Sequence, residues 1–326
     1  MNTKLLFNIK IMLVFSVFLL IFSGCGSENK QTEAAETVKS SLAVDTDNKQ
    51  NVKVGEFDLK KDCVRLNSGY DMPLVGIGTW DISDRQAEES VYTALISGMR
   101  LIDTAVVYGN EAGVGRGIKR SGVPREKIFL TTKLWMPDYK NADQAIDGCL
   151  ARLGTDYIDL LLLHYAGEND EEAYRAMERA VKSGKVRSIG LSNFYEKDFE
   201  RIVKIAKILP AVDQLETHLH HQNGDMKRFL KKYDTVLESW FPLGGRGQTE
   251  AMFNEQTVKK LASKYKKSPA QIIIRWHLQS NNVVMPGSTN PSHIKENYEV
   301  FDFSLTEAEM QELSKLERNV LYGGYY

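Results

Sequence analysis

The chain has 326 residues, of which 42% are hydrophobic and 26% charged, as in a typical soluble globular protein. Its formal net charge is −1 and its pI is about 6.6, so no basic field is present to attract nucleic acid, and no nucleic-acid partner is expected. The three cysteines, Cys25, Cys63 and Cys149, have neither metal-ligand spacing nor the pattern of a disulfide framework. Composition therefore excludes a nucleic-acid-binding protein and a disulfide-stapled domain.

Residues 1–24 have the organisation of a secretory signal peptide. Lys4 and Lys10 supply a positive charge, and the apolar run over 11–22 is short for a transmembrane helix. The following Phe22-Ser23-Gly24-Cys25 resembles a bacterial lipobox, although Phe22 stands where leucine is usual. That resemblance implies cleavage before Cys25, lipidation of Cys25 and anchoring at the extracytoplasmic face of the cell membrane. The alternative is a signal anchor that is never cleaved.

Residues 25–56 are polar and contain no aromatic side chain, which is typical of a disordered tether. The remaining residues, 57–326, are predicted to form the folded domain.

The folded domain is predicted to begin with a β-hairpin, whose turn is Asn67-Ser68-Gly69-Tyr70 between two apolar runs. Pro269 is expected to begin a helix, and Thr306 with Glu309 has the spacing of a capping box. Amphipathic periodicity predicts helices over 84–97, 111–121, 143–153, 171–183, 196–207, 225–233, 257–266, 269–279 and 306–316.

Eight short apolar runs alternate with these helices, and each leads into a chemically active residue. Such alternation implies a parallel sheet, and eight units over about 250 residues predict an α/β protein with a closed (β/α)8 TIM barrel. The carboxyl ends of barrel strands meet on one face, so residues distant in sequence would share one site. The alternative is that strands end in polar residues only because they reach solvent. The eight residues are Trp80, Asp103, Lys133, His164, Asn193, Gln214, Trp240 and Ser288.

Asp103, Tyr108, Lys133 and His164 together are suited to proton transfer. A tyrosine hydroxyl has a pKa of about 10, too high for efficient transfer at neutral pH, and a neighbouring lysine ammonium lowers it. A buried lysine needs a counter-charge, which Asp103 can supply. The histidine can hydrogen-bond a substrate oxygen. Such a site gives a proton to an oxygen that gains negative charge, as carbonyl reduction by hydride requires.

The segment around Asp103 resembles the first signature of the aldo/keto reductase superfamily. The segment begins Gly98-Met99-Arg100-Leu101-Ile102-Asp103-Thr104-Ala105, and Met99 stands where an aromatic residue is usual. Five residues separate Ala105 from Glu111, and two more separate Glu111 from Val114-Gly115. The resemblance covers about 63–304 and assigns the catalytic roles to the four residues just described. It implies a monomer that reduces small aldehydes and ketones with NAD(P)H, or oxidises alcohols in reverse.

The same resemblance implies how a nicotinamide cofactor binds. Ser192, Asn193 and Gln214 match the residues that hold the nicotinamide carboxamide. Trp240 replaces a tyrosine that usually stacks on the ring, and an indole offers an equal or larger π-face. The loop 242–247 matches the pyrophosphate loop, where glycines allow close backbone approach and a cation adds charge. Its expected cofactor contacts are Pro242, Leu243, Gly244 and Arg246.

The adenosine end departs from the family pattern. Gly287 and His293 stand where a lysine and an arginine usually pair with the 2′-phosphate of NADP. The resemblance therefore favours NADP(H) less strongly than usual and leaves NAD(H) possible. A capped helix start is the alternative interpretation of 290–297. The remaining expected contacts are Ser288, Thr289 and Asn290 for the phosphate, and Glu296 and Asn297 for the adenine.

Trp80, Trp135 and Tyr165 are predicted to wall the substrate pocket, with ordinary core packing as the alternative. Three histidines fall within 218–221, but no carboxylate or cysteine completes a ligand set, so no metal is expected. A rival hypothesis is a non-catalytic or weakly catalytic scaffold on the same fold, because nicotinamide cofactor is expected to be scarce outside the cytoplasm. A barrel hydrolase or isomerase would need a carboxylate pair or metal set that the sequence does not offer.

Overall fold

The structure, a computed structural model, describes residues 53–245 and 247–323. The predicted signal peptide, Cys25 and most of the predicted tether lie outside the described residues, as does Arg246. Within the described residues, no helix is long and apolar enough to cross a membrane. The Gly55 amide donates a hydrogen bond to the Arg65 carbonyl over 2.8 Å, so the last few residues assigned to the tether pack against the first hairpin.

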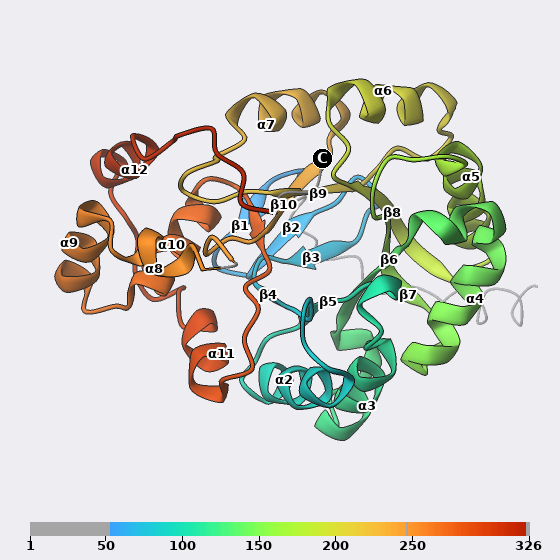
Figure 1. Ribbon diagram of the computed structural model, residues 1–326, viewed down its shortest axis with the longest axis horizontal. Helices are drawn as coiled ribbons and strands as arrows, with labels where there is room; N and C mark the ends of the chain where they lie inside the picture. Colours follow the sequence, from blue (N-terminus) through green and yellow to red (C-terminus); the bar gives the residue numbers. More distant parts are fainter. Residues whose placement is uncertain (1–52, 246, 324–326) are drawn as a thin grey trace, which may run out of the picture. The chain divides into compact units, whose positions relative to one another are not determined.

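An eight-stranded parallel sheet forms the centre of the fold (Figure 1). Neighbouring strands follow one another in chain order, and a parallel bridge between Val75 and Val284 joins the two edges. The Val284 amide donates to the Leu74 carbonyl over 2.9 Å at this closure. The predicted (β/α)8 barrel is therefore confirmed. Its strands are β4 (Gly76–Gly78), β5 (Leu101–Asp103), β6 (Phe129–Leu134), β7 (Ile158–Leu163), β8 (Val186–Ser192), β9 (Val212–Glu216), β10 (Val236–Trp240) and β11 (Val283–Val284).

Burial explains why these strands appear in the sequence as short apolar runs. Every residue of β6, β7 and β9 is buried, since helices cover one face of the sheet and barrel-interior side chains cover the other. A polar residue in such a strand must find an internal partner. Some of these polar positions, such as Asp103, Ser192 and Gln214, face the cavity at the strand ends, whereas Asp159 pairs with Arg125 and Arg187 away from it.

Helices surround the barrel (Figure 1) and correspond to the predicted amphipathic segments. The helices α2 (Asp84–Ile96), α10 (Pro269–Gln279) and α12 (Glu307–Ser314) each begin with a capping box, which confirms the one expected at Thr306, and Pro269 begins α10 as predicted. The other predicted helices are α3 (Glu111–Ser121), α4 (Ala142–Leu153), α5 (Asp170–Lys182), α6 (Glu196–Ile205), α7 (Gly224–Leu230) and α9 (Gln256–Tyr265).

Short elements depart from the predictions. The helix expected to reach residue 233 ends at Leu230 and continues as a 3₁₀ turn, Lys231–Tyr233. The helix α8 (Thr249–Phe253) was not predicted, because five residues are too few to show amphipathic periodicity. The helix α11 (Pro291–Tyr298) starts at the predicted cap, where the Asn290 side chain accepts from the Ser292 amide over 2.9 Å.

The predicted N-terminal hairpin belongs to a three-stranded antiparallel sheet, β1 (Phe57–Asp58), β2 (Cys63–Arg65) and β3 (Asp71–Pro73). Gly69, with φ 86°, supplies the left-handed residue of the turn. Asn67 donates to the carbonyls of Pro210 and Tyr233, which precede β9 and β10. The hairpin therefore contacts the amino ends of the strands and leaves their carboxyl ends free for a site.

Candidate active site

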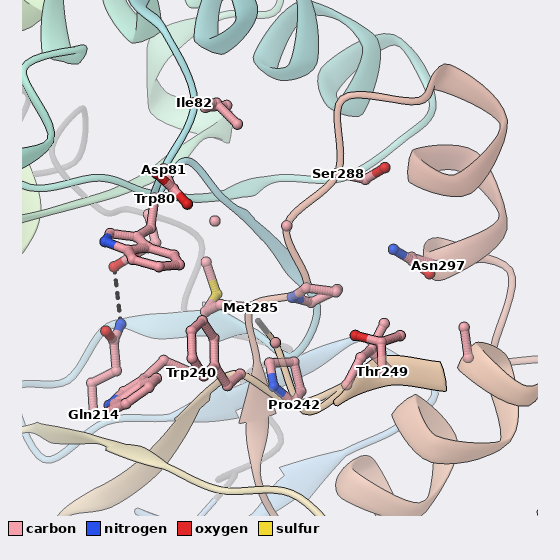
Figure 2. Close-up of a pocket in the computed structure, with 18 of the residues that line it drawn as sticks. Trp80, Asp81, Ile82, Gln214, Trp240, Pro242, Thr249, Met285, Ser288 and Asn297 are labelled. Atoms are coloured by element: carbon pink, nitrogen blue, oxygen red, sulfur yellow. Dashed lines mark hydrogen bonds between the residues drawn. The ribbon is translucent and has the colours of Figure 1, made fainter. Parts of the chain in front are cut away.

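A cavity of about 600 Å³ opens at the carboxyl ends of the strands. Figure 2 shows Trp80 and Asp81 on one side of it, Trp240 and Pro242 below, and Asn297 at the far end. One cavity thus joins residues from most of the βα units. The predicted site residues that line it are Trp80, Asp103, Tyr108, His164, Tyr165, Ser192, Asn193, Gln214, Trp240, Pro242, Leu243, Ser288, Thr289, His293, Glu296 and Asn297.

Four predicted site residues with described positions are absent from the cavity lining. Lys133 is fully buried behind it. The Trp135 ring packs against His164 at 5.2 Å between ring centroids, so this tryptophan supports the wall. Gly244 has φ 87° within the turn after β10, and the Asn290 side chain caps α11.

Lys133 binds the other polar groups at the floor of the cavity. Its Nζ donates to both carboxylate oxygens of Asp103, at 2.6 and 2.8 Å, and to the Thr104 carbonyl at 3.0 Å. It also donates to the Tyr108 hydroxyl at 3.3 Å. Tyr108 reaches this position from a 3₁₀ turn, Val106–Tyr108, that ends at Gly109 in the left-handed region, with φ 67°. The predicted Asp103–Lys133–Tyr108 contact therefore exists.

The pKa of Tyr108 moves in the direction opposite to the one predicted. Removal of the hydroxyl from water raises the pKa to about 12, and the opposing charge of Lys133 only limits that rise. Burial by itself would lower the pKa of Lys133, but Asp103 and Tyr108 raise it overall. At neutral pH the site consequently holds a protonated tyrosine beside a charged lysine, and the lysine can stabilise the phenolate that forms when the proton leaves.

His164 is the third polar group near the Tyr108 hydroxyl. The His164 ring lies edge-on to the Tyr108 ring at 5.7 Å between centroids and stacks on Tyr165 at 5.2 Å. Burial, with a smaller effect from Lys133, holds the pKa of His164 well below its usual value. The neutral imidazole can donate one hydrogen bond to a substrate oxygen without adding a charge.

The residues predicted to hold the nicotinamide form one hydrogen-bonded group with the catalytic floor. The Asn193 amide donates to Ser192 Oγ over 3.0 Å, and the Trp240 indole N–H donates to Asn193 Oδ1 over 3.0 Å. Gln214 donates to Asp103 Oδ2 over 2.9 Å. Asn193 itself has φ 59°, a conformation that asparagine tolerates better than most residues.

The end of the cavity next to α11, where the resemblance places the adenosine, is more exposed. Gly287, Thr289 and His293 are solvent-exposed, and the buried Asn297 lies behind them on α11. Among the described residues that line the cavity, none is a lysine or an arginine. The described lining residues at this end that can donate to a phosphate are Ser288, Thr289, His293 and Asn297.

The structure also reveals functional neighbours that sequence reasoning missed. Glu238 is fully buried on β10, and burial, followed by the charge of Asp103, raises its pKa to about 8. The Glu216 carboxylate accepts hydrogen bonds from the backbone amides of Tyr322 and Gly323. Gly323 packs closely on the Trp240 ring, because a Cβ added to Gly323 would lie only 2.3 Å from that ring. The available signal was an acidic residue within a short buried strand, at Glu238 in β10 and Glu216 in β9.

The three histidines after β9 participate in hydrogen bonds and packing. His218 Nε2 lies 3.0 Å from Glu216 Oε1, and His220 bridges Tyr322 and Glu255 at 2.6 and 2.9 Å. In the described part of the chain, no group of three or more His, Cys, Asp or Glu residues could hold a metal ion. The histidine run instead fastens the C-terminal segment to the barrel.

The sequence profile of the aldo/keto reductase family matches residues 74–318, which is most of the chain. The chain belongs to the aldo/keto reductase family. It is accordingly an oxidoreductase, and members of this family use a nicotinamide cofactor.

Two curated bacterial relatives are similar over most of the chain. A methylglyoxal reductase of Escherichia coli is 39% identical over 265 residues, covering 80% of this chain and 95% of the relative. A glyoxal reductase of Bacillus subtilis is 39% identical over 267 residues, with 81% and 95% covered.

Solved structures of other aldo/keto reductases have the same architecture. An enzyme from a Medee basin deep-sea metagenome library superimposes with a TM-score of 0.77 at 40% identity, covering 81% of this chain and 99% of that one. An aldo/keto reductase from Brucella melitensis gives a TM-score of 0.74 at 42% identity, with 78% and 99% covered. Both similarities extend over nearly the whole described domain.

Proposed function

We propose that this aldo/keto reductase reduces small aldehydes and ketones to alcohols, with Tyr108 as the proton donor. The observation that carries the proposal is the contact between Tyr108 and Lys133, 3.3 Å between hydroxyl and ammonium, with Asp103 bound to the same ammonium. Tyr108 gives its proton to the carbonyl oxygen, and Lys133 stabilises the phenolate that remains. His164 donates a hydrogen bond to the same oxygen as negative charge develops there.

The cavity fits a bound nicotinamide cofactor, which supplies the hydride. Trp240 presents a half-buried ring for stacking, beside amide groups of Asn193 and Gln214 that can orient a carboxamide. Pro242 and Leu243 line the middle of the cavity, where the pyrophosphate would lie. Ser288, Thr289, Glu296 and Asn297 line the far end, within reach of an adenosine.

We propose NADPH as the preferred cofactor and NADH as a usable one. Ser288 and Thr289 offer hydroxyl donors to a 2′-phosphate, which supports NADPH. Gly287 and His293 bring no fixed cation to that phosphate, which supports use of NADH as well. The expected result is measurable turnover with both cofactors.

The names of the relatives suggest the substrate class. Proteins similar to this chain are named as methylglyoxal and glyoxal reductases, so small 2-oxoaldehydes are the first candidates. Trp80 and Tyr165 line the cavity near Tyr108 and His164 and offer apolar ring surface without a cation. A small neutral carbonyl compound is the substrate that this lining would accept.

We also propose that the protein is a lipid-anchored monomer at the extracytoplasmic face of the membrane. The motif before Cys25 supports this, and a diacylglyceryl group there would supply the two acyl chains that stable attachment needs. Replacement Cys25→Ala should abolish incorporation of labelled palmitate and leave uncleaved precursor. Wild-type protein that takes up no lipid label and stays unprocessed in the cytosol would exclude this location.

The test of the enzymatic proposal is oxidation of NADPH and NADH by the purified protein with methylglyoxal, glyoxal and a simple ketone. We expect carbonyl-dependent oxidation with at least one substrate. The scaffold alternative is not favoured, because the relatives named above are reductases. The contact between Tyr108 and Lys133 also supports catalysis. Tight cofactor binding without turnover of any substrate in the panel would favour the scaffold alternative.

A further inference from the structure

Trp240, the last residue of β10, and the following Phe241 and Pro242 line the cavity. Figure 2 shows Trp240 and Pro242 there. Phe241 has φ 51°, a left-handed conformation that is uncommon for a bulky residue. Its ring packs edge-on between Trp80, at 5.3 Å, and Trp240, at 4.8 Å. A strained turn of this kind persists only where surrounding contacts hold it in place.

His277 of α10 makes such a contact from behind the turn. Its side chain is fully buried, and its Nε2 lies 3.2 Å from the Pro242 carbonyl oxygen. A carbonyl oxygen can only accept, so Nε2 carries the hydrogen and donates it. In the neutral ring Nδ1 is then an acceptor, and it lies 3.3 Å from the Ser239 hydroxyl and 3.2 Å from the Asn282 amide nitrogen.

The two ring nitrogens thus contact the chain on both sides of the strained residue. Ser239 precedes Trp240 on β10, and Pro242 follows Phe241. Burial lowers the pKa of His277 to about 3, so the ring stays neutral and keeps one tautomer at every physiological pH. One rigid imidazole on a buried helix therefore spans the base of the turn.

We propose that His277 is a positioning residue for the cofactor: it holds the turn 240–242 so that the Trp240 ring faces the cavity. This inference rests on the proposed function, because it assumes that a nicotinamide cofactor stacks on Trp240. His277 does not line the cavity and has no contact with the reacting atoms. Its loss should weaken cofactor binding much more than it slows the chemical step.

The test compares His277→Phe with His277→Gln in the full-length protein. Phenylalanine keeps the ring but leaves the Pro242 carbonyl without its donor, so the Kd for NADPH should rise about tenfold, while kcat at saturating NADPH changes less than about threefold. Glutamine can donate from its amide nitrogen and accept at its oxygen, so it should restore the Kd to within about threefold of wild type. Quenching of tryptophan fluorescence by NADPH measures the Kd.

Gln279→Met is the matched control. Gln279 lies two residues further along the same helix and bonds the Leu305 backbone, away from the cavity. This variant should lose stability comparable to that of His277→Phe yet bind NADPH like wild type. Equal weakening of NADPH binding in both variants would show that His277 only stabilises the fold, and it would overturn the proposal.

A measurement on the wild-type protein keeps the proposal testable if His277→Phe does not fold. Nitrogen NMR of histidine-labelled protein should show His277 protonated at Nε2 and unprotonated at Nδ1 between about pH 5 and 9. The opposite tautomer would overturn the proposal, because Nε2 could not then donate to Pro242. If wild-type protein binds no NADPH, the proposed function fails; if it binds NADPH and His277→Phe binds equally well, only this inference fails.

Discussion

The two ends of the cavity differ in burial and in how closely their residues are connected. At the end next to Tyr108, Lys133, Asp103 and His164 are 0%, 4% and 7% exposed and are bonded to one another or packed on aromatic rings. At the end next to α11, Gly287 and His293 are exposed. The buried end keeps the four proton-transfer residues that the resemblance implies and departs from the family pattern only at Trp240, whereas the exposed end departs from it at Gly287 and His293.

The difference follows from the cost of substitution. Removal of one member of a buried ion pair leaves a charge without a partner, which costs several kcal/mol. Exposed residues at a pocket rim contribute little to stability, so they can be exchanged without endangering the fold. Cofactor selection can therefore change at this rim while the proton-transfer chemistry stays constant.

Removal of the Tyr108 hydroxyl is the strongest test of the buried end. Tyr108→Phe should lower kcat for carbonyl reduction by about 10²-fold or more, the usual contribution of a general acid. The Kd for NADPH should stay near its wild-type value, because the ring remains in place. Steady-state kinetics and fluorescence titration separate the two effects. Near wild-type turnover would show that another group delivers the proton.

Lys133→Met tests whether pairing of buried charges holds this end together. Asp103 would keep a buried charge with only Gln214 as a side-chain donor, so the free energy of unfolding should fall by about 3–5 kcal/mol. The double variant Lys133→Met with Asp103→Asn removes both charges and should recover part of that loss. Urea denaturation of both proteins measures the difference. Equal stability of the single and double variants would contradict the argument.

Glu238 makes the stability of the buried end depend on pH. Its pKa is about 8 when folded against an ordinary value of 4.5, so the folded state holds the proton that the unfolded chain releases in this window. The contribution of Glu238 to the free energy of unfolding should therefore fall as pH rises from about 5 to 8.

Glu238→Gln should remove this slope, as measured by urea denaturation at pH 5 and pH 8. The exposed Glu200 on α6 provides the control, because Glu200→Gln should leave the wild-type slope unchanged. Parallel pH profiles for wild type and Glu238→Gln would mean that Glu238 is already ionised at pH 5.

The smallest expected effect concerns the exposed end. An added Cβ at Gly287 would lie 3.3 Å from the Gly78 carbonyl oxygen, a tight contact that a small backbone shift must relieve before a side chain is accommodated there. Gly287→Lys should lower the Kd for NADPH by about tenfold and change that for NADH by less than about threefold, because only NADPH offers a 2′-phosphate. Gly287→Gln adds similar length without charge and serves as the control. A wild-type preference for NADPH of several hundred-fold would show that other residues hold the phosphate.

Sequence-based prediction missed the shortest strands and helices and gave the wrong direction for one pKa shift. Periodicity identified the long helices and the buried strands, yet β1 and α8, with two and five residues, carry too little pattern to be recognised. The direction of the Tyr108 pKa shift was wrong, because the spacing of Tyr108 and Lys133 conveys their attraction but not the loss of water around the hydroxyl.

The sequence by itself determined the (β/α)8 barrel and named four candidate catalytic residues, because strand and helix periodicity is written in consecutive positions and the four residues follow a recognisable order along the chain. Only the tertiary structure decided that His277 lies behind Pro242, that Glu238 approaches Asp103 and that Gly323 packs on Trp240. These pairs are separated by 35 residues or more, and side-chain distances and exclusion of water arise only when the barrel closes.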